Sequence, residues 1–275
     1  MSRLERAARG KAGARYGRFR RHRDYRFLIY AALRTGSSSL GQALNGYLGI
    51  QCAMEPFNPG WGGDARGRVS DLPSLEREVQ RLWRRYSGFK HVWDPNGFPF
   101  KGQPEFNDYL LTGAAARVIL LNRRNVLRRI VSNHIAGQAG VFHLSKDADR
   151  VRRSNYRFGP LDISATKEQL AREREAIANV KRRLDETGVP YKMLWYEELF
   201  RADSDDQKRG TLGDIIAFIT GRPFQATFLK SHALANMDPA NAQTNVNSAN
   251  TYEAVPNIHE IENELGCAET GFLFR

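Results

Sequence analysis

Cysteine is scarce in this chain, with Cys52 and Cys267 as the two cysteines among 275 residues. Two cysteines cannot form a disulfide framework, and neither has further ligands at the spacing of a metal site. No apolar run approaches the roughly 20 residues that a transmembrane helix requires, and the first residues lack the apolar segment of a secretory signal. We therefore expect a cytoplasmic protein in a reducing compartment, with neither a membrane span nor a leader.

Acidic residues are outnumbered, because 42 Lys and Arg residues face 30 Asp and Glu residues, for a net charge of +12. Ten basic and two acidic residues lie in Met1–Arg26, so two thirds of the excess belongs to this short segment. Residues 1–25 are interpreted as a basic N-terminal arm. It is either a solvated, partly disordered tail, or an arm that contacts anionic lipid at the inner face of the membrane or another polyanion. Few aromatic residues interrupt the arm, and no nucleic-acid-binding motif follows it, which argues against nucleic acid as the partner.

The remaining residues, 26–275, are expected to form a single domain with a large core, since 41% of the chain is hydrophobic. Runs typical of strands are separated by patterns typical of helices, which predicts an α/β fold with a P-loop-like central parallel sheet flanked by helices. The expected strands are Phe27–Tyr30, Gly88–Trp93, Arg117–Leu121 and Tyr191–Trp195, with a short extended piece in Gln51–Pro59. The expected helices are Leu40–Leu48, Leu72–Tyr86, Pro104–Leu111, Ser164–Thr187, Leu212–Ile219 and Val255–Leu265, with one more after Arg124.

A loop of small residues follows the first predicted strand. Its backbone N–H groups and the positive end of the next helix point toward one place, which favours a bound phosphate. The lysine of a Walker A loop is absent, so a nucleoside triphosphate is not the first choice, and Arg34 takes the place of the usual cation. An ordinary strand-to-helix connection is the alternative. The candidate phosphate-binding residues are Arg34, Thr35, Gly36, Ser37, Ser38 and Ser39.

A second candidate loop follows the strand Arg117–Leu121. Arg123 and Arg124 come before the first helical turn, and Ser132 lies about two turns into the helix. The carboxyl ends of parallel strands share one edge of a sheet, so this loop and the first are expected to face the same cleft. Guanidinium groups there favour a phosphate, whereas a solvated basic helix face is the simpler alternative.

Three short motifs, taken together, resemble those of sulfotransferases that use 3′-phosphoadenosine-5′-phosphosulfate. They are RTGSSSL at Arg34–Leu40, RNVLRRIVS at Arg124–Ser132 and WYEEL at Trp195–Leu199. Each is weak alone, but they occur in the family's order on the expected elements. The form of the first motif and the block LNRRNVLRRIVSNHI are most similar to bacterial carbohydrate sulfotransferases of the rhizobial nodulation-factor type.

The resemblance implies a sulfotransferase fold and a role for each motif. The first loop would hold the 5′-phosphosulfate, and Arg124 and Ser132, eight residues apart, would bind the 3′-phosphate. Tyr196 would lie near the adenine. The implied acceptor is a hydroxyl of a sugar or glycolipid, the product is adenosine 3′,5′-bisphosphate, and no metal is needed.

The catalytic residues implied are Arg34 and one general base. Cytosolic eukaryotic members carry a lysine in the first loop, so Arg34 is expected to act electrostatically near the bridging oxygen. Glu55 is the first candidate base, because it resembles the carboxylate position of the bacterial carbohydrate enzymes. His91 is the second, since Lys90 and His91 lie where other members have a lysine and a catalytic histidine. Alternation along a strand puts these two on opposite faces, so only one of them can face the site.

Simpler roles remain open for both candidate bases, namely an exposed loop acid for Glu55 and a structural histidine for His91. Two other functions also remain. A P-loop kinase would need a Walker lysine that this chain lacks. A polyanion-binding module would use the basic arm and the arginines of Arg123–Arg129. The acceptor pocket is expected in the loops Glu55–Gly67 and Ala136–Pro160, the latter as a loop or lid, and neither loop indicates a particular acceptor.

Overall fold

The structure is a computed structural model that describes residues 25–60, 65–142, 151–152, 155–200, 204–238 and 252–274. The predicted basic arm, residues 1–25, lies outside the described residues except for Tyr25. That residue is buried, and its hydroxyl donates a hydrogen bond to the carbonyl of Gly49 over 2.9 Å. None of the described helices has the length and apolar character needed to cross a bilayer.

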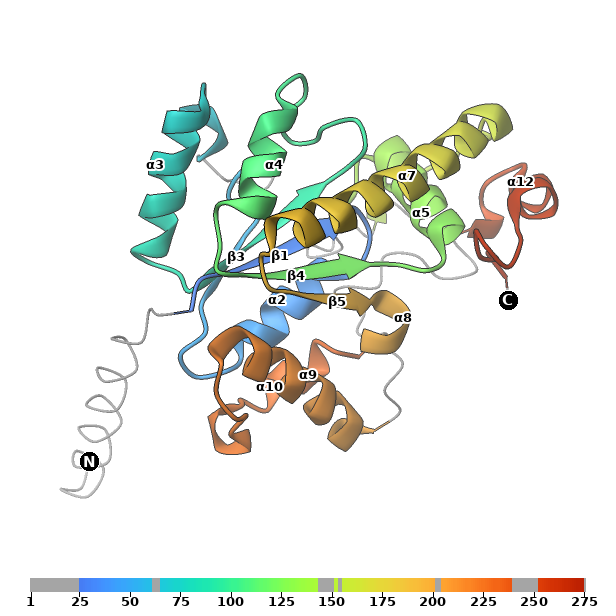
Figure 1. The fold of residues 1–275 in the computed structure, drawn as a ribbon. Helices are drawn as coiled ribbons and strands as arrows, with labels where there is room; N and C mark the ends of the chain where they lie inside the picture. Colours follow the sequence, from blue (N-terminus) through green and yellow to red (C-terminus); the bar gives the residue numbers. More distant parts are fainter. Residues whose placement is uncertain are drawn as a thin grey trace.

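A five-stranded parallel sheet forms the centre, in the order β2-β3-β1-β4-β5 (Figure 1). Its strands are β1 (Phe27–Ala32), β2 (Cys52–Met54), β3 (Gly88–Trp93), β4 (Arg117–Asn122) and β5 (Tyr191–Trp195). The α/β class with a central parallel sheet and flanking helices is confirmed. Because β1 lies between β3 and β4, the loops that follow β1 and β4 begin side by side at the carboxyl edge.

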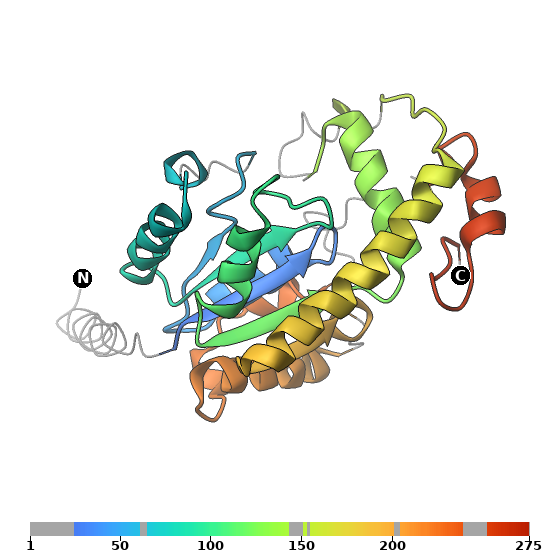
Figure 2. The same ribbon diagram turned by 45° about the horizontal axis from the view of Figure 1, so that its top comes forward.

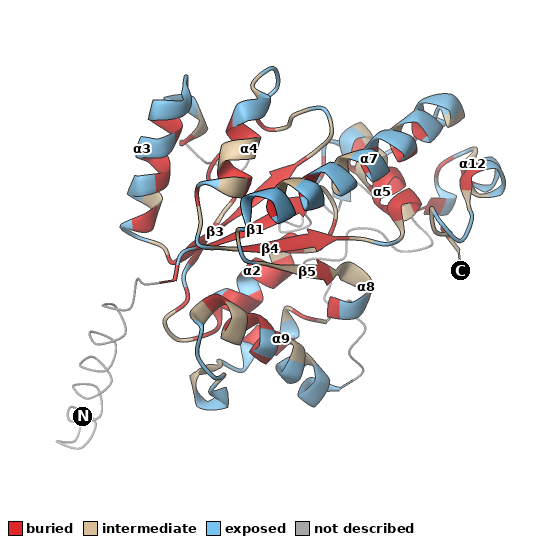
Figure 3. Cartoon of the chain, in the orientation of Figure 1, coloured by how far each residue is buried: buried red, intermediate tan, exposed pale blue. Residues whose placement is uncertain are grey.

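Helices cover both faces of the sheet (Figure 1). One face carries α3 (Leu72–Trp83), α4 (Pro104–Thr112) and α7 (Ile163–Thr187), and the other carries α2 (Ser37–Asn45), α9 (Asp205–Thr220) and α10 (His232–Ala235). Alternate side chains of β1 enter the two cores, Leu28 and Tyr30 on the α3 side, Phe27 and Ile29 on the α2 side. The sheet is therefore buried on both faces, as Figure 3 shows, which is why β1 and the middle of β4 are continuously apolar.

Three helices lie toward the carboxyl edge, α5 (Val126–Ala139), α8 (Tyr196–Leu199) and α12 (Ile258–Leu265). In Figure 2, α5 and α12 lie beside the end of α7 beyond the strands. A third apolar cluster joins α5, α7 and α12, with Ile130, Leu170 and Ile261 among its buried residues. Helix α12, near the C-terminus, thus packs with α5 in one apolar cluster. Two short 3₁₀ turns, η1 (Arg66–Arg68) and η2 (Ala226–Phe228), complete the described elements.

Several predicted boundaries shift. The predicted loop or lid begins too early at Ala136, because the last residue of α5 is Ala139, and Gly140, with φ 63°, caps the helix. Residues 143–150 and 153–154 of the predicted loop lie outside the described part. Helix α9 begins at Asp205 rather than at the predicted Leu212, and the Ser204 side chain caps it by accepting the N–H of Gln207. Helix α2 begins at Ser37 rather than Leu40, which places the serines in its first turn.

Candidate functional site

The first loop turns sharply between β1 and α2. Arg34 and Gly36 both adopt left-handed backbone conformations, with φ of 64° and 78°. The Thr35 hydroxyl donates to the carbonyl of Ala32 over 2.8 Å and so fixes the turn onto the end of β1. The chain then enters α2 at Ser37, and the N-terminal amides of this helix form the positive end of its dipole.

Arg34 joins the first loop to α5. Its Nε donates to Oγ of Ser132 over 3.1 Å, and its NH1 donates to the carbonyl of Phe142 over 2.9 Å. Ser132 is buried on the first two turns of α5. The structure therefore brings together two residues predicted to bind different ends of the same ligand. Arg34 therefore also contacts α5, the helix whose Ser132 was expected to bind the 3′-phosphate.

The third motif packs against the first loop. A Cβ added to Gly36 would lie 2.5 Å from Cε2 of Phe200 and 3.0 Å from Cδ2 of Tyr196, so this position excludes a side chain. The guanidinium carbon of Arg123 lies 4.4 Å from the centre of the Tyr196 ring. Tyr196 is thus in contact with both loops, and the three motifs meet at the carboxyl edge of the sheet.

Arg124 extends toward the surface from the turn before α5. Its side chain is 57% exposed, its NH2 forms an ion pair with Glu198, and its guanidinium carbon lies 5.2 Å from the centre of the Trp195 ring. An exposed ion pair of this kind contributes little to stability, about 0–1 kcal/mol. The guanidinium is therefore accessible to a competing anion such as a phosphate.

Lys90, from β3, joins the first loop to Glu55, although it was not among the residues that the sequence predicted for the site. Its side chain is 1% exposed, its Nζ donates to Oγ of Ser38 over 2.7 Å, and it forms an ion pair with Oε1 of Glu55. Burial lowers the pKa of the Lys90 ammonium, and the charge of Glu55 opposes that shift. Alternation along β3 was the signal that could have identified Lys90, because it allowed only one of Lys90 and His91 to face the first loop.

Glu55 lies just after β2 and is held from two sides. Oε1 pairs with Lys90, and Oε2 accepts a hydrogen bond from Nδ2 of Asn58. These two partners fix the orientation of the carboxylate.

Backbone strain is concentrated at the predicted site residues. Among the residues that the structure describes, Arg34 and Glu55 are the two non-glycine residues in the left-handed region, with φ of 64° and 48°. Such conformations cost of the order of 1 kcal/mol each, and they persist where the surrounding contacts hold them. This observation does not depend on the motifs. It singles out Arg34 and Glu55, which are two of the three residues predicted to be catalytic.

No family model, no curated protein and no solved structure matches this chain. A function for this chain is therefore inferred from the motifs and from the contacts among them.

His91 points away from the first loop. It packs against Tyr30, with ring centres 5.5 Å apart, and its Nε2 lies 2.8 Å from Oδ1 of Asn107. The residue is 2% exposed, and burial lowers its pKa from 6.5 to about 4. These surroundings are those of a neutral, packed histidine on the α3 side of the sheet, opposite the face that carries Lys90.

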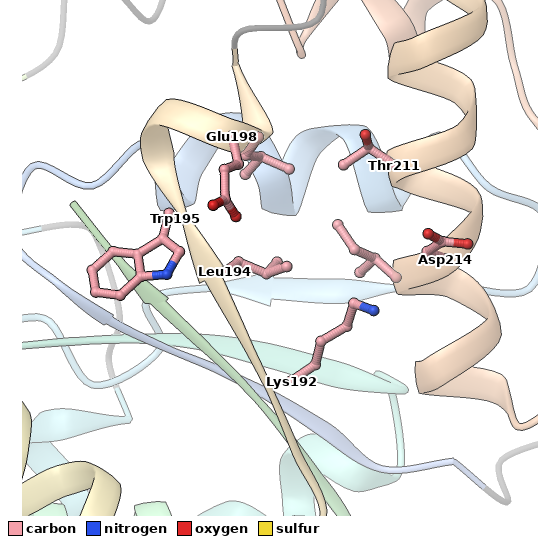
Figure 4. Close-up of a pocket in the computed structure, with 8 residues that line it drawn as sticks. Lys192, Leu194, Trp195, Glu198, Thr211 and Asp214 are labelled. Carbon is pink, nitrogen blue, oxygen red and sulfur yellow. The ribbon is translucent and has the colours of Figure 1, made fainter. Parts of the chain in front are cut away.

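A cavity of about 200 Å³ lies beside the third motif, between β5, α8 and α9 (Figure 4). The side chains around it are Lys192, Leu194, Trp195, Glu198, Leu199, Thr211, Asp214 and Ile215. Trp195 and Glu198 thus border both this cavity and the guanidinium of Arg124. Its walls come from β5, α8 and α9 rather than from the first loop, so we do not assign the candidate site to it.

Proposed function

We propose that this chain is a sulfotransferase of the carbohydrate type, which transfers the sulfuryl group of 3′-phosphoadenosine-5′-phosphosulfate to a hydroxyl of a sugar or glycolipid. The observation that carries the proposal is the hydrogen bond from Arg34 to Ser132, because it joins two motifs expected at opposite ends of one donor. The packing of Tyr196 on Gly36 supports it by adding the third motif to the same place.

The donor would lie along the carboxyl edge of the sheet. In this proposal the amides at the start of α2 and the Ser38 hydroxyl hold the 5′-phosphosulfate, Arg124 and Ser132 bind the 3′-phosphate, and Tyr196 contacts the nucleoside. Arg34 supplies positive charge between the two ends. The arginines, Lys90 and the helix N-terminus provide the field that a loose, in-line sulfuryl transfer requires, without a metal ion.

Glu55 is the proposed general base. Its carboxylate takes the proton of the acceptor hydroxyl as the acceptor oxygen bonds to sulfur. The bond between sulfur and the 5′-phosphate oxygen breaks at the same time, and adenosine 3′,5′-bisphosphate leaves with the bonding electron pair. The proposal gives His91 no part in this step, because its ring is buried against Tyr30 on the other face of β3.

Lys90 is the cation proposed to connect the two halves of the reaction. It contacts Ser38 in the first loop and Glu55 in the base position, so one ammonium group spans the sulfuryl cradle and the base. There it orients the carboxylate and stabilises negative charge on the transferred group. In the sequence-based expectation Arg34 filled this electrostatic role alone.

The proposal is tested by incubating the purified protein with ³⁵S-labelled donor and a panel of glycan and glycolipid acceptors, without Mg²⁺. Labelled acceptor together with equimolar adenosine 3′,5′-bisphosphate is the expected result. Thermal stabilisation by ATP with Mg²⁺ alone would instead indicate a kinase, and stabilisation by heparin alone a polyanion-binding module.

A further inference from the structure

The carboxylate of Glu197 holds the turn that carries Arg124. Its Oε2 accepts the backbone N–H of Arg124 over 2.9 Å, and its Oε1 accepts the backbone N–H of Asn125 over 3.0 Å. These amides immediately precede α5, where N–H groups have no partner within the helix. Glu197 thereby fastens the third motif to the second across more than 70 residues of sequence.

The same carboxylate contributes charge as well as hydrogen bonds. Oε1 of Glu197 lies 3.9 Å from Nε of Arg123, whose guanidinium covers the ring of Tyr196. One side chain therefore fixes the backbone of two residues and attracts the side chain of a third. From the opposite side, Nδ2 of Asn125 donates to the carbonyl of Phe272 over 2.6 Å.

We propose that Glu197 is the positioning residue of the 3′-phosphate site, a role that rests on the proposed function. Pairing between a guanidinium and a phosphate is directional, so it depends on a fixed backbone beneath Arg124. Glu197 supplies that fixed backbone without contacting the ligand. Its negative charge does not prevent an anion from binding nearby, because two amides at a helix N-terminus and Arg123 already neutralise it.

Replacement by glutamine isolates this role. In Glu197→Gln one acceptor oxygen becomes an NH₂ group, which faces a backbone N–H that also donates, so one of the two hydrogen bonds is lost together with the charge. The matched control is Glu175→Gln, which removes the same charge from an exposed position on α7. Glu197→Asp is a second variant, which keeps the charge but withdraws the carboxylate by one methylene.

The test compares two ligands that differ only in the 3′-phosphate, adenosine 3′,5′-bisphosphate and adenosine 5′-monophosphate, by calorimetric titration of wild type and variants. Glu197→Gln is expected to weaken binding of the bisphosphate about tenfold and that of the monophosphate less than about twofold. Glu197→Asp should show the same selective loss to a smaller degree, and Glu175→Gln should match wild type.

Two results would overturn the inference. One is unchanged binding of the bisphosphate by both Glu197 variants. The other is an equal loss for both ligands, which would mean that Glu197 supports the fold in general. A wild-type protein that does not bind the bisphosphate more tightly than the monophosphate would contradict the proposed function itself. This failure is distinguishable from a failure of the Glu197 inference, because it is seen in the wild type before any residue is replaced.

Discussion

Arg34 and Ser132 are 98 residues apart in sequence, and Nε of the first donates to Oγ of the second over 3.1 Å. The bond exists because β1 and β4 are neighbours in the sheet, so the residues that follow them share one edge. Arg34 reaches Ser132 from a left-handed backbone conformation, which the turn onto α2 imposes. A loop that by itself resembles an ordinary connection thereby becomes part of a candidate site with α5.

Removing the Ser132 hydroxyl is expected to weaken donor binding. Ser132→Ala deletes a proposed ligand of the 3′-phosphate and a partner of Arg34, and we predict a fivefold to tenfold loss, about 1–1.5 kcal/mol, for adenosine 3′,5′-bisphosphate. Calorimetric titration measures it. Ser70→Ala, at a position before α3, serves as the control and should bind as wild type does. Equal affinity of Ser132→Ala and wild type would contradict the assignment.

Glu55→Gln should abolish turnover while leaving binding of adenosine 3′,5′-bisphosphate within about twofold of wild type. A general base contributes about 10²–10⁴ in rate, so a fall of at least about 100-fold is expected once activity is normalised to folded protein. The comparison variant is His91→Gln, which should keep its turnover per folded molecule. If His91→Gln is inactive and Glu55→Gln is active, the two assignments must be exchanged.

The ion pair between Lys90 and Glu55 is buried, which makes its two halves interdependent. Lys90→Met leaves a carboxylate without its cation, and Glu55→Gln leaves an ammonium without its anion, so each is expected to lower the free energy of unfolding by about 3–5 kcal/mol. The double variant removes both charges and should cost clearly less than the sum of the singles. Urea unfolding measures all four proteins, and strictly additive effects would show that the pair is not coupled.

Stability should fall as the pH is lowered below 6.5, and His91 is one cause. Its pKa is about 4 in the folded protein and 6.5 ordinarily, so the unfolded chain binds more protons between these values. The contribution of neutral His91 to the free energy of unfolding is complete above pH 6.5. It is lost as the pH falls toward 4, by up to about 3 kcal/mol. His91→Gln should therefore have a flatter profile of unfolding free energy between pH 7 and pH 5. Burial also lowers the pKa of His134, but that contribution is common to both proteins. Parallel profiles would contradict this account of His91.

Much of the fold follows from the sequence, because its signals are local. The apolar run of β4 predicts a strand buried on both faces, and β3 and β5 have the predicted bounds. The start of α9 was missed, since Asp205 and the residues after it lack an apolar stripe and the helix depends on the Ser204 cap instead. That the two arginine-bearing loops share an edge was also predictable, from parallel topology alone.

The side-chain partners at the site could not be predicted in the same way. Whether Lys90 or His91 faces the first loop depends on which face of β3 is covered by α2, and a strand pattern does not specify that. The contacts of Glu197 depend on how α8 packs against the turn before α5, which brings together residues 72 positions apart. Such pairings arise from the three-dimensional packing and leave no periodic signal in the sequence.

The most direct test of the central claim is calorimetric titration of the wild-type protein, without Mg²⁺, with adenosine 3′,5′-bisphosphate and then with adenosine 5′-monophosphate. The account predicts saturable binding of one bisphosphate per chain, at least about tenfold tighter than that of the monophosphate. Equal affinity for the two nucleotides, or binding of neither, would contradict it.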